Sequence, residues 1–574
     1  MLAAAPARAA GPEAWDSIAR ELAAPWPGLQ ASDGRFPDYV VRTAGGRSQR
    51  DDYGEAILGY GLLQVGIRTG DEATIRAGLR GVTHAADRPE RRFNIAMFRN
   101  VGIAGAYNLA RERIPEHPQF RQVRATWERR LRGMRLDRLR SRTVTNKTLV
   151  EAVAVLELLR SGLSSRNRGT VLGNKGGARR LVRRLLTRGL PRAAAPFDRG
   201  SGRGGRLSML GDYPHLPLAY HALATGFLAR AVELLGGAAP APARRLLREA
   251  AGASWALAGP DGDLSYFGRS QEQVWTLPLT AYGAEVAAPS AGAGAGRLRA
   301  LSERAVGRLD EAYTVGSRGL FVVPALARDL RRGVRALDSY VAATPYNGLT
   351  LVALNWAIET PAAMAAPTET GADLDGSFVV GTRRATFATV RTGDVWFAVK
   401  EAHAPDDDLR SDFGLVALKA READGSWRDV LALRPRREGR RDSAGPVLTR
   451  GARRALPDGD GLRVTAQGRV TVTARYPALR RRAAIAFEPT PCGVRMAVAG
   501  RRGDAWETSW FLPQAPRIEE RSLTGSGQIV TFDRRARVAL ERGYSSATEP
   551  TLTRARARLA PGAGPLEVTV CREP

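Results

Sequence analysis

The stretch "TPAAMAAPTETGADLDG", Thr360 to Gly376, separates two parts of the chain whose apolar residues recur at different intervals. Before it, from about residue 14, the apolar spacing is mainly three and four, which is typical of amphipathic helices. After it, apolar residues tend to alternate with polar ones, which is typical of strands with one buried face. The stretch itself is rich in Pro, Thr, Gly and Asp. We therefore interpret it as a linker between two domains, in a chain of 574 residues that is longer than one hydrophobic core usually supports.

Helical spacing is clearest in five segments of the first part, residues 53–67, 93–113, 148–163, 211–236 and 271–288. Many helices of ordinary length in antiparallel succession predict an array of helical hairpins. No fixed sequence period is present, which disfavours a short-repeat solenoid.

Turn residues divide the second part into short strands. "RATFATVRTGDVWFAVK" (Arg384 to Lys400) predicts a hairpin with its turn at Thr392-Gly393-Asp394, and "LRVTAQGRVTVTARY" (Leu462 to Tyr476) predicts another around Gln467-Gly468. Further strand candidates are "AAIAFE", "GVRMAVAG", "QIVTFD", "RVALERG" and "LEVTVC". The pattern predicts an antiparallel β-sandwich.

The predicted organisation is thus an array of helical hairpins over residues 14–362, a linker over 363–376 and the β-sandwich over 377–574. The first thirteen residues, "MLAAAPARAAGPE", have the small-residue texture of a signal-peptide cleavage region but lack a charged start and a full apolar segment. They are either the remnant of an export signal or a disordered tail, and we favour the remnant. The expected location is accordingly secreted or extracytoplasmic.

The formal net charge of +29 comes almost entirely from arginine, since lysine occurs only at Lys147, Lys175, Lys400 and Lys419. Such a charge attracts polyanions, whether nucleic acid, an anionic membrane surface or an acidic polysaccharide. Clusters such as "RRLVRRLL" (Arg179 to Leu186) are anion contacts or solvated helix faces. No helix-turn-helix, zinc-finger or RNP-type motif is present, so we expect no nucleic-acid partner.

The sequence lacks the motifs of membrane-spanning, metal-binding and phosphate-binding proteins. No apolar run approaches the roughly 20 residues of a membrane span. No His/Cys cluster has metal-ligand spacing, "PDDD" (Pro405 to Asp408) reads first as an acidic loop, and no phosphate-binding fingerprint is present. We expect neither a metal nor a cofactor. The two cysteines, Cys492 and Cys571, form either one disulfide of an exported protein or two separate buried thiols.

Three short segments resemble the heparinase II/III and alginate lyase group of polysaccharide lyases. "GDYPHLPLAYHALATGFLARAVELLG" (Gly211 to Gly236) resembles the group's loop that runs into a Tyr-His pair at a helix start, here Tyr220-His221. "TVTNKTLVEAVAVLELL" (Thr143 to Leu159) is similar to its Asn-His segment, with Asn146 kept and Lys147 in place of the histidine. "GPDGDLSYFGRSQEQ" (Gly259 to Gln273) is similar to a further loop of the group. In the second part, the loop around His403 is a poor match to the group's His/Gly-rich loop.

The resemblance implies that the helical hairpins of residues 14–362 form an incomplete α/α toroid. It also implies β-elimination of an anionic, uronic-acid-containing glycan. Tyr220 is then the proton-transfer residue and Asn146 neutralises the substrate carboxylate, with His215, His221 and His403 as supporting catalytic candidates. Tyrosine acts as a base when neighbouring cations lower its pKa, and amide N–H groups stabilise developing negative charge. Candidates for substrate binding are Tyr213, Lys147, Tyr266, Arg269, Gln271, Gln273, Tyr346 and Asn347.

Structural roles compete with these assignments. Asn146 is also a good helix N-cap, and Tyr220 also fits a rim tyrosine that packs on the apolar stripe of its helix. Tyr346 and Asn347 lie in "PYNG", which predicts a turn before an apolar helix, and Trp275 reads as a core residue.

Two other functions compete with the lyase. A glycoside hydrolase on the same toroid needs two carboxylates across the cleft, for which Asp212 and Glu272, or Asp52 and Glu55, are available. A protein that binds anionic glycans without cleaving them would also account for Lys147 and the poor histidine loop. The sequence does not indicate the polysaccharide or the oligomeric state.

Overall fold

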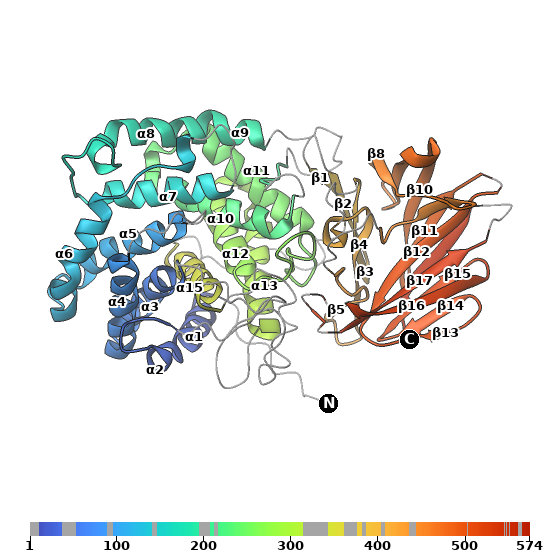
Figure 1. Ribbon diagram of the computed structural model, residues 1–574, viewed down its shortest axis with the longest axis horizontal. Coiled ribbons are helices and arrows are strands. Elements are labelled where there is room, and N and C mark those ends of the chain that lie inside the picture. The colour runs from blue at the N-terminus through green and yellow to red at the C-terminus, as the bar shows by residue number, and fades with distance from the viewer. Residues whose placement is uncertain are drawn as a thin grey trace. The chain divides into compact units, whose positions relative to one another are not determined.

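The computed structural model describes most of the chain (Figure 1). The described residues are 11–36, 53–88, 96–140, 146–194, 207–211, 216–313, 343–360, 376–381, 386–402, 408–435, 443–501, 503–544, 546, 548–549, 551–560 and 565–573.

The chain divides into two compact units. The helical unit comprises Met1–Ala194, Tyr220–Gly252 and Gln273–Thr368, and the β unit comprises Ala195–Ala219, Ala253–Glu272 and Glu369–Pro574. Two segments from the helical part of the sequence therefore group with the strands, which the apolar spacing gave no reason to expect. Nearly all of the predicted linker lies outside the described residues, and the predicted domain boundaries stay a prediction.

Helices account for the first part of the chain, as predicted. They are α1 (Pro12–Ala23), α2 (Trp26–Leu29), α3 (Gly54–Thr69), α4 (Glu72–Asp87), α5 (Ala96–Arg113), α6 (Pro118–Arg132), α7 (Asn146–Arg160), α8 (Lys175–Arg184), α9 (Leu190–Ala193), α10 (Leu218–Leu235), α11 (Ala241–Leu257), α12 (Thr276–Ala287), α13 (Ala295–Tyr313) and α15 (Ala343–Glu359).

Six of the described helices form a closed circuit of contacts, in the order α3, α5, α7, α10, α12 and α15. Helix α3 packs against both α5 and α15, α5 against α7, and α12 against α15. Helix α10 joins the circuit through an ion pair to α7, from Arg230 to Glu157, and through a hydrogen bond from Tyr282 of α12 to Glu233. These inner helices are buried nearly all round, which explains why five of them were the clearest apolar segments of the sequence.

Other helices pack on the outside of the circuit. Helix α4 contacts α3, α6 contacts α4 and α5, α8 contacts α7, α13 contacts α12, and α1 contacts α15. Glycines permit the closest approaches: a Cβ atom added at Gly102 of α5 would lie 2.6 Å from the carbonyl oxygen of Ala56 in α3. The helical hairpins and their ring are the toroid architecture that the sequence predicts.

The inner helices run in the same direction. Helices α10 and α12 touch near their starts through Tyr220 and Trp275, and farther along through Glu233 and Tyr282. The same comparison applies to the pairs α12 and α15, α15 and α3, α3 and α5, and α5 and α7. In each pair, one contact joins residues that come early in both helices, and a second contact joins residues that come later in both, so the two helices are parallel. All six N-termini therefore lie at one end of the ring, which we call the N-terminal rim.

The β unit contains three antiparallel sheets. The first has the order β1-β2-β3-β4-β5, the second β13-β14-β15-β18-β11-β10-β9-β8 and the third β16-β17-β12-β6-β7. The strands are β1 (Gly376–Gly381), β2 (Thr386–Thr392), β3 (Val395–Lys400), β4 (Gly414–Arg421), β5 (Trp427–Asp429), β6 (Val447–Arg450), β7 (Arg453–Ala455), β8 (Asp458–Val464), β9 (Val470–Tyr476), β10 (Arg481–Thr490), β11 (Gly493–Ala499), β12 (Ala505–Leu512), β13 (Arg517–Ile518), β14 (Ser522–Gly525), β15 (Gln528–Phe532), β16 (Ala536–Tyr544), β17 (Leu552–Leu559) and β18 (Leu566–Arg572).

One apolar core joins the three sheets, with members such as Phe397, Ile485 and Trp506. Both predicted hairpins are confirmed: Thr392 pairs with Val395 across the first turn, and Val464 pairs with Val470 across the second. The predicted fold class, helices followed by antiparallel β-sheets, is confirmed.

The cysteines are joined. A disulfide links Cys492, in the turn between β10 and β11, to Cys571 of β18. Of the two alternatives that the sequence left open, the structure has the bonded pair.

Candidate active site

A buried network of charged side chains joins the neighbouring inner helices α7 and α10. Arg230 of α10 donates to Glu157 of α7 at 2.5 Å and to Glu233 at 2.6 Å. Asn108 of α5 donates to the other Glu157 oxygen at 3.0 Å. The Arg230 guanidinium also lies 4.9 Å from the ring centre of Trp356. Burial disfavours the charge of Arg230, but Glu157 and its other neighbours hold the pKa of Arg230 well above its usual range.

This network sets the relative height of Asn146 and Tyr220. Asn146 is eleven residues before Glu157 on α7, and Tyr220 is ten residues before Arg230 on α10. At 1.5 Å per residue, the two residues lie about 16 Å and about 15 Å from the network, in the same direction. The two principal residues of the sequence hypothesis therefore lie at the same level of the N-terminal rim.

Aromatic side chains continue this level around the rim. Tyr220 contacts Trp275 edge to face with ring centres 6.0 Å apart, and Trp275 contacts Tyr346 in the same way at 6.4 Å. Tyr53, beside the start of α3, stacks on Phe98 of α5 at 5.1 Å. Trp275 belongs to the apolar interior, as predicted, and it also joins two candidate site residues.

Asn146 is the first residue of α7 and is 4 % exposed. Its side-chain oxygen accepts the backbone N–H of Lys147 at 2.6 Å. An N-cap residue instead accepts from the second or third helical N–H, so this contact differs from the usual cap. The Asn146 amide N–H₂ donates to no residue that the structure describes, which leaves both of its hydrogens available to a ligand.

Several buried polar atoms at the starts of α12 and α15 have no hydrogen-bond partner among the described residues. They are both amide atoms of Gln273, the indole N–H of Trp275, the hydroxyl of Thr276 and the side-chain oxygen of Asn347. Buried polar groups are nearly always paired, and exceptions need an explanation such as a bound ligand or water. Gln273 and Asn347 were predicted from the sequence. Thr276 was not, because a threonine at a helix start reads as ordinary capping.

Tyr346 and Asn347 lie inside a helix, which corrects the predicted turn. Helix α15 begins at Ala343, and Pro345 occupies its first turn, where its missing N–H costs nothing. The Asn347 amide donates to the carbonyl of Ala343 at 2.9 Å.

Three further sequence candidates, Tyr266, Arg269 and Gln271, belong to the β unit. The Tyr266 hydroxyl donates to the carbonyl of Leu257 at 2.9 Å, and its ring packs edge to face on Trp396. Burial raises the pKa of Tyr266 well above its usual range. Gln271 donates to the carbonyl of Tyr266 at 2.9 Å, and Arg269 is partly exposed. Tyr266 and Gln271 thus hold their own loop together, and their role in substrate binding stays a prediction.

The same loop carries unusual backbone geometry. Ser270 and Glu272 have φ angles of 63° and 50°, and Leu216, which lies just before α10, has 47°. Left-handed backbone is costly for residues other than glycine and is enriched at functional sites. No sequence motif indicated this strain.

The remaining candidates divide into buried, partly exposed and undescribed residues. His221 is fully buried in α10, where its backbone carbonyl accepts from Thr225. Lys147 is partly exposed next to Asn146. His215, Tyr213 and His403 lie outside the described residues, as do Asp212 and Asp52 of the hydrolase alternative. Of the other two carboxylates, Glu272 is 1 % exposed, and Glu55 lies in the first turn of α3.

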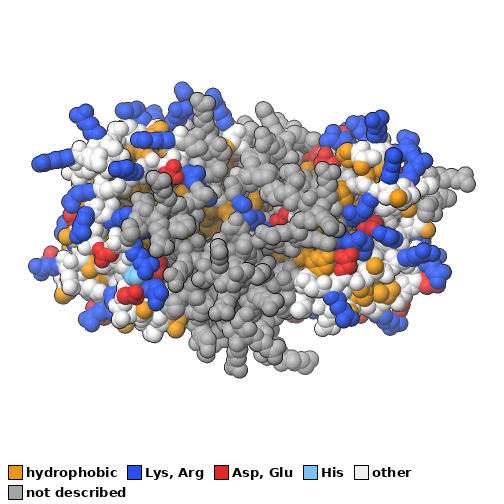
Figure 2. Space-filling view, viewed as in Figure 1, with side chains coloured by type: hydrophobic (Ala, Val, Ile, Leu, Met, Phe, Trp, Pro, Cys, Tyr) orange, Lys and Arg blue, Asp and Glu red, His pale blue; other side chains and the backbone are white. Residues whose placement is uncertain are grey.

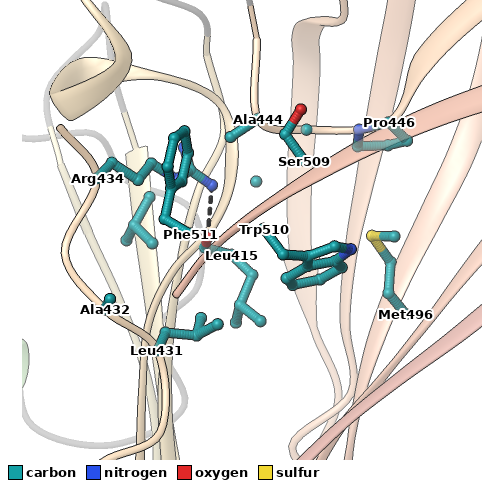
Figure 3. Close-up of a pocket in the computed structure, with 13 residues that line it drawn as sticks. Leu415, Leu431, Ala432, Arg434, Ala444, Pro446, Met496, Ser509, Trp510 and Phe511 are labelled. Atoms are coloured by element: carbon teal, nitrogen blue, oxygen red, sulfur yellow. Dashed lines mark hydrogen bonds between the residues drawn. The ribbon is translucent and has the colours of Figure 1, made fainter. Parts of the chain in front are cut away.

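Among the described residues, the candidate side chains belong to no cluster of metal ligands and line none of the cavities described for this part of the chain. In the described part of the chain, no group of three or more His, Cys, Asp or Glu could hold a metal ion. Among the same residues, no helix is long and apolar enough to cross a membrane. Figure 3 shows a small cavity of the β unit, where Arg434 donates to the carbonyl of Leu415 beside Trp510 and Phe511. None of the predicted site residues lines it.

Comparison with known proteins gives structural likenesses without a sequence family. No family model matches the chain, and no curated protein matches its sequence. The structure is similar to the chondroitin AC lyase of Streptomyces coelicolor A3 in complex with chondroitin sulphate (14 % identity, 99 % of this chain and 80 % of that chain, TM-score 0.47). It is also similar to the heparan sulfate lyase HepC of Pedobacter heparinus (11 % identity, 100 % and 85 %, TM-score 0.42).

A glycosyl hydrolase family 88 protein of Bacteroides vulgatus matches 61 % of this chain over 99 % of its own length, at 12 % identity and a TM-score of 0.39. At these identities and scores the likenesses assign no residue and no substrate to this chain. The case for a function depends on its own residues.

Proposed function

We propose that this protein is a polysaccharide lyase that cleaves an anionic, uronic-acid-containing glycan by β-elimination at the N-terminal rim of the helical unit. The observation that carries the proposal is the common level of Asn146 and Tyr220, which follows from the ion pair between Glu157 and Arg230. The available amide hydrogens of Asn146 support it further.

The chemistry requires a base, a proton donor and a group that stabilises negative charge. The Tyr220 phenolate removes the proton at C5 of the uronate, and the electron pair left behind expels the O4 leaving group. The Asn146 amide donates to the substrate carboxylate, on which negative charge develops in the transition state. The Tyr220 hydroxyl then returns the proton to the departing oxygen, so that the products are a new chain end and an unsaturated uronyl end.

The rim suits an anionic substrate. The N-terminus of each inner helix carries roughly half a positive charge from aligned peptide dipoles, and six such ends converge there. The net charge of +29 adds a long-range attraction for polyanions. Tyr220 is partly exposed beside the buried ring of Trp275 and offers aromatic surface to a sugar ring. The polar atoms of Gln273, Thr276 and Asn347 that have no partner among the described residues offer partners for hydroxyl groups.

We further propose that the protein acts outside the cytoplasm. The disulfide between Cys492 and Cys571 supports this location, because disulfides persist in oxidising compartments.

The test is a panel of acidic glycans, with the unsaturated uronyl end followed by its ultraviolet absorbance. On a glycan that the wild type cleaves, Tyr220→Phe and Asn146→Ala should each lower kcat roughly 100-fold or more. The matched control is Tyr107→Phe, which removes a hydroxyl bonded to Glu128 on the outer side of the ring. It should keep the wild-type rate.

Three results would overturn the proposal. Full activity of Tyr220→Phe would remove the assigned base. New reducing ends without ultraviolet absorbance would indicate a hydrolase instead, and binding without either product would indicate a glycan-binding protein.

A further inference from the structure

An acid-free stretch of the chain forms an arginine row on the outside of the helical unit. Residues 158–197 contain no Asp or Glu but ten Lys or Arg residues. Most of these lie on one continuous helical segment built from α8, the π-helical turn η3 (Leu185–Gly189) and α9. Figure 2 shows Lys and Arg side chains along the upper edge of the molecule, over α8 and α9.

The arginines of this segment are exposed and have no acidic partner in the part of the chain that the structure describes. None of the six makes an ion pair or hydrogen bond with a side chain that the structure describes; they are Arg179, Arg180, Arg183, Arg184, Arg188 and Arg192. On α6, in contrast, Arg124 and Arg132 both pair with Glu128. Like charges four residues apart destabilise a helix by a few tenths of a kcal/mol per pair. The segment therefore tolerates a repulsion that a bound anion would relieve.

The π-turn brings four of these arginines into line. In a regular helix with 100° per residue, Arg192 would lie about 120° around the axis from Arg180. The backbone N–H of Leu190 instead bonds to the carbonyl of Leu185, five residues earlier, so one turn takes up one extra residue. That extra residue reduces the offset to about 20°, and Arg184 and Arg188 fall within about 40° of Arg180. The arginine row, Arg180, Arg184, Arg188 and Arg192, is thus straight and about 16 Å long.

A pocket continues the row at its first residue. Arg180 and Arg140 both line a cavity of about 230 Å³, together with Thr170 and Leu136. Both arginines are exposed. The pocket has room for one charged substituent beside the row.

We propose that the arginine row and its pocket form a second binding site, in addition to the candidate residues Asn146 and Tyr220, for an extended anionic polysaccharide. A straight row of four cations matches a polymer with regularly repeated anionic groups better than a single small ion. Nucleic acid fits less well, since residues 158–194 contain no aromatic side chain on which a base could stack. The disulfide also supports the proposed location outside the cytoplasm, away from most of the cell's nucleic acid.

The experiment measures binding of heparin fragments of defined length to the full chain. The row variant, R180S/R184S/R188S/R192S, should bind roughly tenfold more weakly or worse, because it loses four surface charge contacts. The salt dependence of its binding constant should also become shallower. The charge-matched control is R482S/R495S/R517S/R535S, which removes four exposed arginines of the β unit that already pair with acidic residues. Both variants lower the net charge from +29 to +25, so they differ in where the charges are removed and in whether those charges were paired.

A second variant tests geometry at constant composition. The swaps T187R/R188T and R192A/A193R move two charges by about 100° around the helix and should also weaken binding, though less than the row variant. The row variant should keep the wild-type kcat on any glycan that the wild type cleaves, and fragment binding is measured whether or not the fragments are cleaved. This result is therefore separate from the outcome for the proposed lyase.

If the row variant and the β-unit control lost equal heparin affinity, net charge alone would account for the loss. That result would overturn the proposal. Tighter binding of duplex DNA than of heparin fragments of equal charge, lost in the row variant, would identify nucleic acid as the partner and overturn it as well.

Discussion

Replacement of Glu157 by glutamine tests the ionic network that sets the height of the candidate site. Glu157 is 1 % exposed and accepts from both Arg230 and Asn108. Glutamine keeps the shape but removes the charge, and its amide N–H₂ must face one of these two donors. Breaking a buried ion pair costs about 3–5 kcal/mol, because the remaining charge stays buried. Arg230 keeps Glu233, which is 31 % exposed, so we expect the lower end, about 3 kcal/mol.

The assay is thermal unfolding followed by far-ultraviolet circular dichroism, which reports mainly on the helices. For a unit of this size, about 2 °C per kcal/mol converts the loss to a fall of about 6 °C in Tm. The control is Glu128→Gln on α6, whose partners Arg124 and Arg132 are about half exposed. Surface pairs contribute about 0.2–1 kcal/mol each, so the loss of two pairs should lower the Tm of the control by about 1–4 °C. A Glu157→Gln protein that unfolds within 1 °C of the wild type would refute the role of this ion pair in holding α7 against α10.

Two further predictions concern the β unit. Cys492→Ser/Cys571→Ser should lower the unfolding free energy by about 4 kcal/mol, since the disulfide closes a loop with a sequence separation of 79. Denaturant unfolding with and without reductant measures this loss. A wild-type protein whose stability did not change with reductant would contradict the prediction. Burial lowers the pKa of Lys400 to about 8 from its ordinary value of 10.5, against the opposing effect of Asp412. The folded chain therefore loses this proton first as the pH rises, so the stability of the β unit should increase by about 3 kcal/mol between about pH 8 and about pH 10.5. Denaturant midpoints over this range measure the increase, which should be absent in Lys400→Met; an unchanged increase in that variant would assign it to other groups.

The apolar pattern of the sequence was sufficient for the fold class because the inner helices and the hairpin strands have strong periodic signals. Strand β17 was missed, although its sequence "LTRARARL" alternates, because arginine reads as a solvent-facing residue. Arg554 of this strand is in fact fully buried and donates to the hydroxyl of Ser509. The grouping of two segments from the first part of the sequence with the β unit was also beyond the sequence, since Asp261 and Lys419 meet only in the folded chain.

The candidate site was predictable only in part. Asn146 and Tyr220 came from short motifs, and their common level depends on contacts between helices far apart in sequence. The unpaired hydroxyl of Thr276 and the left-handed backbone of Ser270 and Glu272 leave no pattern in a single sequence. The arginine row was visible as a cluster, but its alignment depends on the π-turn.

The position of β18 in its sheet has a consequence for biosynthesis. This strand, the last of the sequence, lies between β15 and β11 in the middle of the eight-stranded sheet. Because the chain is synthesised from its N-terminus, β11 and β15 leave the ribosome before β18. Until β18 is made, each of them has an edge whose backbone hydrogen-bond partner is missing. Unpaired edges are templates for association with other chains. The β unit therefore completes its folding only after translation of β18, and the interval before that is when the nascent chain most needs protection from aggregation.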